Sequence, residues 1–465
     1  MPNTVAFTHT HHPARTLAIA FLLAGSGLAM AQTAMVQPYL PSAPQPFEKT
    51  WLPGFRYVAS PEQADPEDDL KRRPPEQQTV VRDYQSGQYL DAARGGVLLM
   101  RKGPVDDRLR LMIANSLAWT GYMDAAVQTY QGVTDPALVG EANTGIASIL
   151  RWQGKDHLAR PIYQNVLDQN PNDKEAAAGL ALSERELAPR TTFNFGGLQD
   201  ANNFHRDAAS VNHRWRSDDG WKKYEVDLTG VHDTLPGVDA RQTAATLRYQ
   251  ALDLMYKPTV ELGVPTSGGA PYGGIKLLVA EDHVQLDLGE VNWAQMANNA
   301  NALQQQLRAA HAGVLARTEV NLGTWMGQAD YYSISDGNVV WTANTRLTGN
   351  WQPLGNTIKP FVGAEARQAT FYTPSYWSPN TGYGSLYAGL QYGQEVAGWN
   401  LEASGQLGVP VYGEAADSWG ASASARRWVS NDVAIGASLW AIGMRRTDQP
   451  YSAQSFNVFL EKVWR

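Results

Sequence analysis

The stretch Trp399-Asn400-Leu401-Glu402-Ala403-Ser404-Gly405-Gln406-Leu407 decides the fold of the C-terminal part of this chain. Apolar or small residues stand at its odd positions and polar residues at its even positions. Because successive side chains of a strand point to opposite faces, this period of two predicts a β-strand with one apolar and one polar face.

The same alternation recurs on both sides of this stretch, from Thr191 onward. It is clearest in four further runs, namely 224–229, 284–288, 386–392 and 433–439. Turn sequences such as Ser335-Asp336-Gly337-Asn338 separate the runs. At roughly 17 residues per strand and turn, the region 190–465 supplies about 12–16 strands of a length that crosses a bilayer. Met296–Ala312, rich in Ala, Asn and Gln, is expected to be a helical or extended loop.

Alternation alone fits both a soluble β-sandwich and a transmembrane β-barrel with a polar lumen. The polar-side residues are often small, the chain ends in an expected strand at Phe456–Trp464, and tryptophans recur near strand ends, as interfacial belts require. These tryptophans are Trp221, Trp325, Trp341, Trp351, Trp399, Trp428 and Trp464. We therefore expect an antiparallel outer-membrane barrel over 190–465 and keep a lectin-like sandwich as the alternative.

The composition agrees with this expectation. The 465 residues include 42 Gly, 15 Trp and 20 Tyr but no Cys. Without cysteine there is no disulfide scaffold, no thiolate catalysis and no Cys-ligated metal. The net charge of −7 argues against a nucleic-acid partner.

The N-terminus has the features of an export signal over residues 1–31. The apolar run Leu17–Leu23 follows a basic stretch, and Ala29-Met30-Ala31 precedes Gln32 as a cleavage site. A short N-terminal membrane helix is the alternative. Residues 32–78 are rich in proline, which predicts an extended linker or a partner-docking arm.

A helical repeat is expected over 79–188, because glycine, alanine and tyrosine recur there at matching intervals. The recurring residues are Gly87, Gly121 and Gly154, then Ala92, Ala126 and Ala159, then Tyr130 and Tyr163, with Pro171 closing the last unit. The first unit departs from the pattern, since Gly96 stands where the aromatic is expected. A final helix is predicted at Glu175–Leu187, and an ordinary small helical bundle is the alternative.

The pattern of the helical units resembles the tetratricopeptide repeat, which implies a partner-binding role. The order of signal peptide, repeats and barrel resembles the exopolysaccharide export porins, such as the poly-N-acetylglucosamine export porin and the cellulose-operon outer-membrane subunit. Two local stretches are similar to that family, namely Tyr331–Asn338 and Tyr376-Trp377-Ser378-Pro379. The resemblance implies a multi-domain α+β chain, with a short TPR-like α-solenoid in the periplasm and a barrel that passes a secreted polysaccharide across the outer-membrane lipid. Its repeats would then bind the polymer or periplasmic biosynthesis and modification proteins.

The polar strand faces supply the candidate lumen residues. The acidic ones are Glu225, Asp227, Glu261, Asp287, Glu319, Glu365, Glu402 and Glu461, and the basic ones are Arg248, Arg346, Arg367 and Arg426. The acidic excess predicts a preference for a neutral or partly cationic polymer. Alternatively, these charges pair with one another and brace the barrel.

Catalysis finds no support in the sequence. No zinc-protease, phosphate-loop or nucleophile-elbow motif is present in the mature chain, and its histidines lack ligand spacing. We therefore expect neither an enzyme nor a metal or cofactor site. A surface receptor or adhesin of the phage-adsorption type and a periplasmic scaffold with a sugar-binding sandwich remain as alternatives to an exporter.

Overall fold

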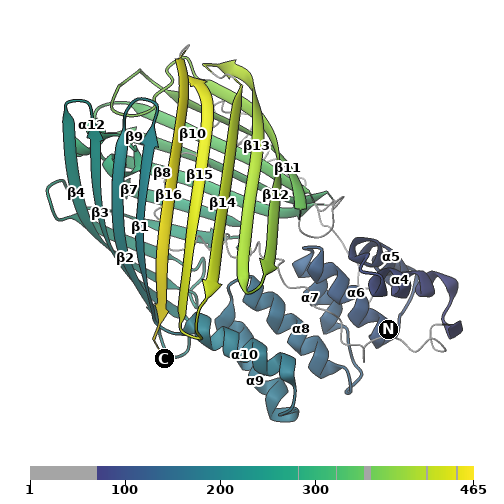
Figure 1. Cartoon of the computed structure of the whole chain (residues 1–465). Helices are drawn as coiled ribbons and strands as arrows, with labels where there is room; N and C mark the ends of the chain where they lie inside the picture. The colour runs from purple at the N-terminus through teal and green to yellow at the C-terminus, as the bar shows by residue number, and fades with distance from the viewer. Residues whose placement is uncertain are drawn as a thin grey trace.

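The computed structural model describes residues 71–280, 282–320, 322–349, 358–414, 417–446 and 449–464. The expected export signal and nearly all of the expected linker lie outside these residues. The first part of the described chain is helical and the second is a β-barrel (Figure 1). The helical bounds are α4 Pro75–Gln85, α5 Tyr89–Lys102, α6 Asp107–Trp119, α7 Met123–Gln131, α8 Val139–Trp152, α9 Asp156–Gln169 and α10 Lys174–Leu187.

The helices form antiparallel pairs at the expected glycines. Gly87, Gly121 and Gly154 end α4, α6 and α8 with positive φ angles of 79°, 94° and 72°, which glycine adopts without steric cost. Helix α4 begins at Pro75, before the expected residue 79, because proline is well suited to the first turn of a helix.

Neighbouring pairs are joined by an aromatic ring that packs on a glycine of the next helix. Tyr130 of α7 covers Gly145 of α8, and Tyr163 of α9 covers Gly179 of α10. A methyl group on either glycine would lie 2.4 or 2.3 Å from the ring. In the first pair the partners are exchanged, since Gly96 of α5 receives Ile113 of α6. This exchange explains why Gly96 stands at the aromatic position of the repeat.

The rest of the described chain forms sixteen antiparallel strands that close into a barrel, within the expected range. Each strand pairs with its neighbours in sequence, and β1 closes on β16 from Arg190↔Val463 to Asp200↔Ala453. The strands are β1 Arg190–Asp200, β2 His205–Arg216, β3 Lys222–Leu235, β4 Val238–Ala251, β5 Thr259–Pro265, β6 Tyr272–Val279, β7 Val284–Val291, β8 Ala309–Val320, β9 Gly323–Ile334, β10 Val339–Gly349, β11 Ile358–Ala369, β12 Tyr383–Val396, β13 Trp399–Gly413, β14 Ser418–Trp428, β15 Val433–Arg446 and β16 Gln449–Val463.

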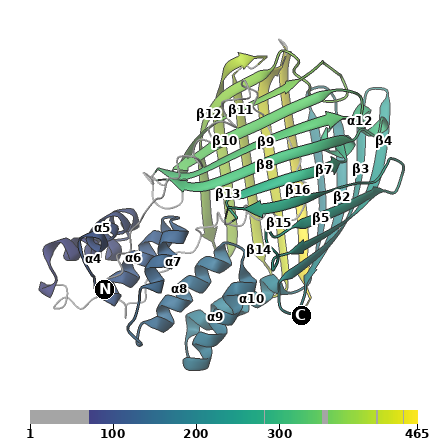
Figure 2. The ribbon, with the colours of Figure 1, turned by 180° about the vertical axis from the view of Figure 1, so that it is seen from behind.

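The helices lie against one end of the barrel (Figure 1, and from behind in Figure 2). Because α10 leads directly into β1, odd-numbered strands begin and even-numbered strands end at this helical end. The opposite, far end carries α11 Trp293–Met296 and α12 Ala300–Gln304, inside the loop between β7 and β8. The predicted loop Met296–Ala312 is thus partly helical, but its last residues, from Ala309, belong to β8.

The outward face of the barrel is apolar and exposed, whereas a soluble sandwich buries its apolar faces and exposes its polar ones. Exposed large apolar side chains recur along β1, β3, β12, β13 and β16, for example Phe195, Leu228, Leu386, Leu407 and Val458. A continuous apolar exterior on a closed antiparallel barrel is the surface that lipid covers. The chain is therefore an outer-membrane type β-barrel, and the sandwich alternative is wrong.

The aromatic residues near the strand ends divide into two groups. Trp325, Trp341 and Trp399 are at outward register positions, and Trp464, directly after β16, is exposed, as an interfacial belt requires. Trp221 instead lies in the β2–β3 turn against His157 of α9, and Trp428 lies beneath Arg185 of α10. Trp351 lies outside the described residues. Among the described helices, none is both long and apolar enough to cross a membrane.

Candidate functional site in the barrel lumen

The register of the strands defines which side chains face the lumen. Asn212, Asp227 and Thr246 are register partners on β2, β3 and β4 and are all buried, opposite in parity to the exposed outward residues. By the same pairing, the candidate lumen residues occupy inward positions. These are Glu225, Asp227, Arg248, Glu261, Asp287, Arg346, Glu365, Arg367, Glu402, Arg426 and Glu461. The side chain of Glu319 lies outside the described ones.

Two of the expected acidic residues belong to an ion-pair network on β3 to β5. Arg248 donates through Nη1 to Glu225 Oε1 and through Nε to Glu261 Oε2, the latter at 2.5 Å. Asn212 Nδ2 donates to Glu225 Oε1 at 3.0 Å and lies 3.3 Å from Asp227 Oδ2. These contacts agree with the bracing interpretation for this part of the wall.

A second network joins the barrel seam to the last helix. Glu461 Oε1 accepts from Arg190 at 3.0 Å and from Arg426 at 2.9 Å. Arg190 is also 3.2 Å from Glu186 of α10, and Arg214 is 3.9 Å from the same carboxylate. The helix C-terminus is therefore fixed to strands β1, β2, β14 and β16 through shared charges.

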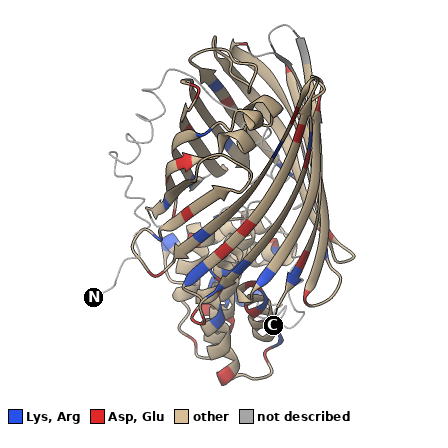
Figure 3. Ribbon diagram, turned by 90° about the vertical axis from the view of Figure 1, so that its left-hand side faces the viewer, with Lys and Arg blue, Asp and Glu red and all other residues tan. Residues whose placement is uncertain are grey.

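The structure corrects the expected acidic excess of the lumen. Inward basic residues gather near the helical end, and many of the Lys and Arg positions along this edge are visible in Figure 3. We call them the helical-end belt: Arg190, Arg214, Arg216, Lys223, Arg248, Lys276, Arg317, Arg346, Lys359 and Arg426. The described acidic residues at inward positions of the same level are fewer, namely Glu225, Glu261, Asp287, Glu395, Glu402 and Glu461.

Sequence reasoning missed most of this belt for a local reason. Arg214, Arg216 and Lys223 flank the β2–β3 turn, where aromatic and basic residues interrupt the apolar–polar alternation. Lys276 and Lys359 stand in runs whose inward face is small or apolar. The sequence does hold one signal for these residues. Counting each position as odd or even from the nearest strand with regular alternation assigns its side chain to the lumen.

A different part of the wall, on β13 to β15, is free of dense ion pairing. Its inward side chains are small or carry hydroxyl and amide groups, namely Ser404, Gln406, Ser422, Ser424 and Ser438. Ser422 is exposed and the others are half-buried, and the hydroxyls of Ser404 and Ser422 are 2.7 Å apart. This hydroxyl wall leaves the lumen accessible along three neighbouring strands.

At the far end, two long loops pack onto the inward side of the barrel. Leu303 of α12 packs with Ala208, Val231 and Ala240, which are inward residues of β2 to β4. The β7–β8 loop, residues 292–308, also meets the β11–β12 loop, residues 370–382. In that contact Gln305 Nε2 donates to Ser375 Oγ at 3.0 Å and Asn299 Nδ2 donates to the Pro374 carbonyl at 3.1 Å.

A buried ion pair anchors the first of these loops. Arg206 and Asp233 are 4% and 0% exposed and pair through two contacts of 2.6 Å. Arg206 Nη1 also donates to the Gln295 carbonyl at 2.7 Å and to Asn298 Oδ1 at 2.5 Å. Since a buried arginine needs all its donors satisfied, the loop completes the coordination of Arg206.

The two stretches that carried the family resemblance meet at this far end. Tyr376 OH donates to Asp336 Oδ2 at 2.8 Å, and Asn338 Nδ2 donates to the Phe371 carbonyl at 2.9 Å. Trp293 of α11 contacts Tyr376, with ring centroids 5.4 Å apart. The β9–β10 hairpin and the β11–β12 loop thus form one unit with the β7–β8 loop.

The helical part docks on the turns of the helical end. The His157 ring lies 4.7 Å from that of Trp221 in the β2–β3 turn, and Lys155 Nζ lies 3.7 Å from Asp282 Oδ2 in the β6–β7 turn. Burial, together with nearby positive charges led by Arg216, lowers the pKa of His157 to about 4. His157 is therefore neutral in the docked state at ordinary pH.

Aromatic and polar side chains of α4, α6 and α7 pack between successive helices of the helical part. Tyr84 is buried, and its ring stacks on Trp119 at 5.7 Å. Asn115 Nδ2 donates to Tyr84 OH at 3.2 Å, and Tyr130 OH donates to Asn115 Oδ1. These contacts join successive helices and fit a packing role.

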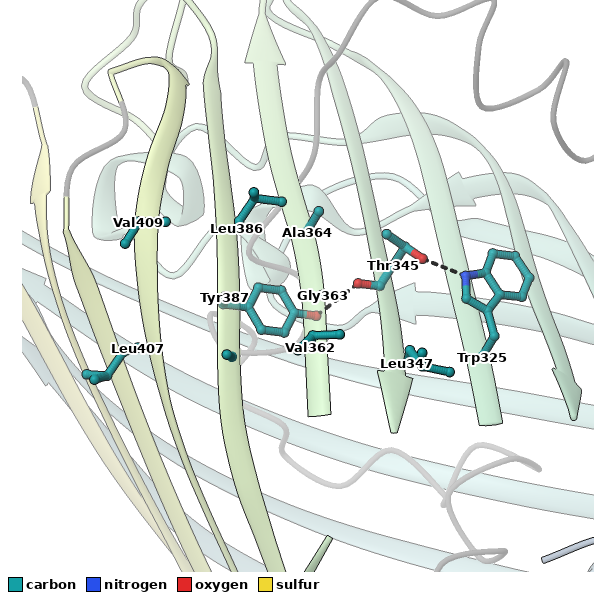
Figure 4. A pocket seen from close by; sticks show the side chains of 11 residues that line it. Trp325, Thr345, Leu347, Val362, Gly363, Ala364, Leu386, Tyr387, Leu407 and Val409 are labelled. Atoms are coloured by element: carbon teal, nitrogen blue, oxygen red, sulfur yellow. Dashed lines mark hydrogen bonds between the residues drawn. The ribbon is translucent and has the colours of Figure 1, made fainter. Parts of the chain in front are cut away.

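An apolar hollow of about 650 Å³ lies on the outer face of β9 to β13 (Figure 4). Its lining includes Leu347, Val362 and Leu386, and its one indole nitrogen, on Trp325, donates to Thr345 Oγ1 at 2.8 Å. The hollow faces the lipid and belongs to the membrane surface, not to the lumen. Among the described residues, no cluster of His, Asp or Glu could hold a metal ion.

In sequence and in structure, the known proteins that were compared with this chain are only distantly similar to it. No protein-family model matches the chain, and no curated protein matches it. A solved structure described as a bacterial polysaccharide outer membrane secretin is similar at 10% identity and a TM-score of 0.46, covering 60% of this chain and 99% of that one. OccK5 (OpdH) of Pseudomonas aeruginosa has 9% identity, a TM-score of 0.34 and coverage of 60% and 98%. OprB of Pseudomonas putida is similar at 9% identity and a TM-score of 0.33, covering 62% of this chain and 97% of that one. At these TM-scores, the function of the lumen has to be argued from its own residues.

Proposed function

We propose that this chain is an outer-membrane channel through which a secreted polysaccharide leaves the cell. The observation that carries the proposal is the hydroxyl wall on β13 to β15. Sugar chains are recognised by hydroxyl and amide groups, and Ser404, Gln406 and Ser422 offer these groups toward the lumen. A polymer that slides needs many weak contacts and no deep binding site, which suits such a wall.

The orientation follows from the lengths of the connections. At the helical end the described turns, such as 217–221 and 429–432, are short, whereas the longer loops 292–308 and 370–382 are at the far end. Bacterial barrels have short periplasmic turns and longer extracellular loops. In this proposal the helical end therefore lies in the periplasm. There the TPR-like array binds the polymer before it enters the barrel, or binds the proteins that make and modify the polymer.

The experiment narrows the lumen at the hydroxyl wall. In the bacterium that carries the gene, the deletion strain is complemented with wild type, with Ser422→Trp or with Ala423→Trp. Ala423 is the matched control, because it is the next residue of β14, is exposed and faces the lipid.

We expect deletion and Ser422→Trp to lower the secreted polysaccharide in the medium and to raise the amount retained in the periplasm. Ala423→Trp should restore secretion. Both variants must reach the outer membrane with heat-modifiable gel migration, so that misfolding is recognised. Secretion that is unchanged in the deletion strain would overturn the proposal and leave a receptor or adhesin as the alternative.

A further inference from the structure

The basic residues of the helical-end belt indicate which charge the exported polymer carries. This inference rests on the proposed function. We infer that the lumen takes an anionic polysaccharide, a chain carrying carboxylate groups, which it captures at the belt. The expected acidic lumen pointed to a neutral or partly cationic polymer. The charges that reach the lumen near the helical end point the other way.

The first argument compares how deeply the basic and the acidic side chains of this level are buried. Apart from the buried Arg190, the basic side chains of the belt are half-buried and face inward. Glu225 and Glu461 at the same level are only 3% and 7% exposed. These two carboxylates therefore lie deeper in the wall than the basic groups. Glu261, Asp287 and Glu402 are half-buried and Glu395 is exposed, but ten inward basic residues face these six described acidic ones, so positive charge is in excess in the potential that a solute meets there.

The second argument is that the buried acidic residues are shared. Glu461 pairs with both Arg190 and Arg426, and Glu225 pairs with both Arg248 and Lys223. With Glu186 and Arg214 included, the Glu461 network holds three cations and two carboxylates and retains one positive charge, whereas Glu225 and Glu261 balance Lys223 and Arg248. Rings of Lys and Arg of this kind select anions in pores.

The third argument concerns the wall away from these networks. Arg346 of β10 donates to the Gln391 side-chain oxygen at 2.8 Å, and its guanidinium lies 3.7 Å from the centre of the Phe361 ring. Lys359 occupies an inward position on the next strand, opposite Gln391. The contacts described for Arg346 are to an amide and a ring, which leave its charge in place.

Three acidic residues in the far half of the lumen are buried and paired, so they do not repel an anionic chain. Asp233, Asp330 and Glu365 are at most 5% exposed. Asp233 pairs with Arg206, His311 Nε2 is 2.9 Å from Asp330 Oδ1, and Tyr383 OH donates to Glu365 at 2.9 Å. These carboxylates are engaged within the wall, and a chain captured at the belt continues along the uncharged hydroxyl wall.

The test measures ion selectivity and blockade of the full-length protein in planar lipid bilayers. Under a KCl gradient, the reversal potential should show preference for chloride over potassium. Arg346→Gln with Lys359→Gln should shift it toward cation preference. Arg427→Gln is the matched control, since Arg427 is an outward residue of β14 at the same end and its loss removes charge from the lipid-facing side.

Three oligosaccharides of similar length then serve as probes, namely oligogalacturonate, malto-oligosaccharide and glucosamine oligomers. Oligogalacturonate added at the helical side should block the current at the lowest concentration. The double variant should raise its half-blocking concentration roughly tenfold, the order expected for loss of electrostatic attraction. Lys359→Gln alone gives a second, milder variant if the double variant does not fold.

The two proposals fail in different ways. A cation-selective current, or equal blockade by the neutral and the anionic probe, overturns the inference and leaves the channel standing. A barrel with heat-modifiable migration that shows no conductance overturns the proposed passage, and with it the anionic substrate.

Discussion

His157 makes the docking of the helices onto the barrel sensitive to acid. Its pKa is about 4 when docked and near 6.5 when exposed, because burial and Arg216 disfavour the charged ring. A depressed histidine pKa means that the undocked state takes up the proton first. Docking is therefore fully stable above pH 6.5 and weakens as the pH falls toward 4, by up to about 3 kcal/mol.

Hydrogen–deuterium exchange of α9 in the intact protein measures this effect. Exchange should accelerate between pH 6.5 and 4, after correction for the intrinsic pH dependence. His157→Phe keeps a ring against Trp221 but does not titrate, so its protection should stay level over the same range. Equal acid sensitivity in both proteins would assign the effect to other groups.

Single residues were predictable only where the alternation was clean. Glu402 and its neighbours follow a strict period of two, and their inward positions follow from it. Arg216 and Lys223 flank a turn, where no period remains to assign a face. The charge of the lumen depends on such positions, and for this reason the expected acidic excess was wrong.

At the scale of elements, the helical array depends on glycines that receive a tyrosine ring. In an exposed helix, replacing glycine by alanine stabilises by about 1 kcal/mol. At Gly179 the added methyl would lie 2.3 Å from the Tyr163 ring, so the sign reverses. We expect Gly179→Ala to destabilise the array by roughly 1–3 kcal/mol, the cost of overpacking a core.

Gly140 is the control for this prediction. It lies in the first turn of α8, and a methyl group there would meet nothing within 4 Å. Thermal unfolding followed by helical circular dichroism should show a lower midpoint for Gly179→Ala and an equal or higher midpoint for Gly140→Ala. A lowered midpoint in both would mean that the tyrosine contact is not the cause.

Elements were predicted better than their contacts. The intervals between Gly87, Gly121 and Gly154 locate the helix pairs, because each glycine ends a helix with positive φ. The same sequence does not show that Ile113 and Gly96 exchange roles in the first pair. Nor does it show that α12 packs on the inward side of β3 and β4, since that contact joins segments far apart in the chain.

At the scale of the whole molecule, the barrel and the sandwich share one sequence pattern and differ in closure. Closure is a contact between the first and last strands, which alternation does not encode. In the structure Phe195 of β1 stands opposite Val458 of β16, and both side chains are outward and exposed. Opposed residues of antiparallel strands lie within the Cα separation that a disulfide requires.

The absence of cysteine from the chain makes this closure directly testable. Phe195→Cys with Val458→Cys should form a disulfide that ties the two ends of the barrel together. After boiling without reductant, the cross-linked chain should migrate differently from the reduced one. Phe195→Cys with Leu228→Cys should not cross-link, because β1 and β3 are separated by β2 and thus by roughly 10 Å. A cross-link in the control alone would place β1 in a different pairing and open the barrel at its seam.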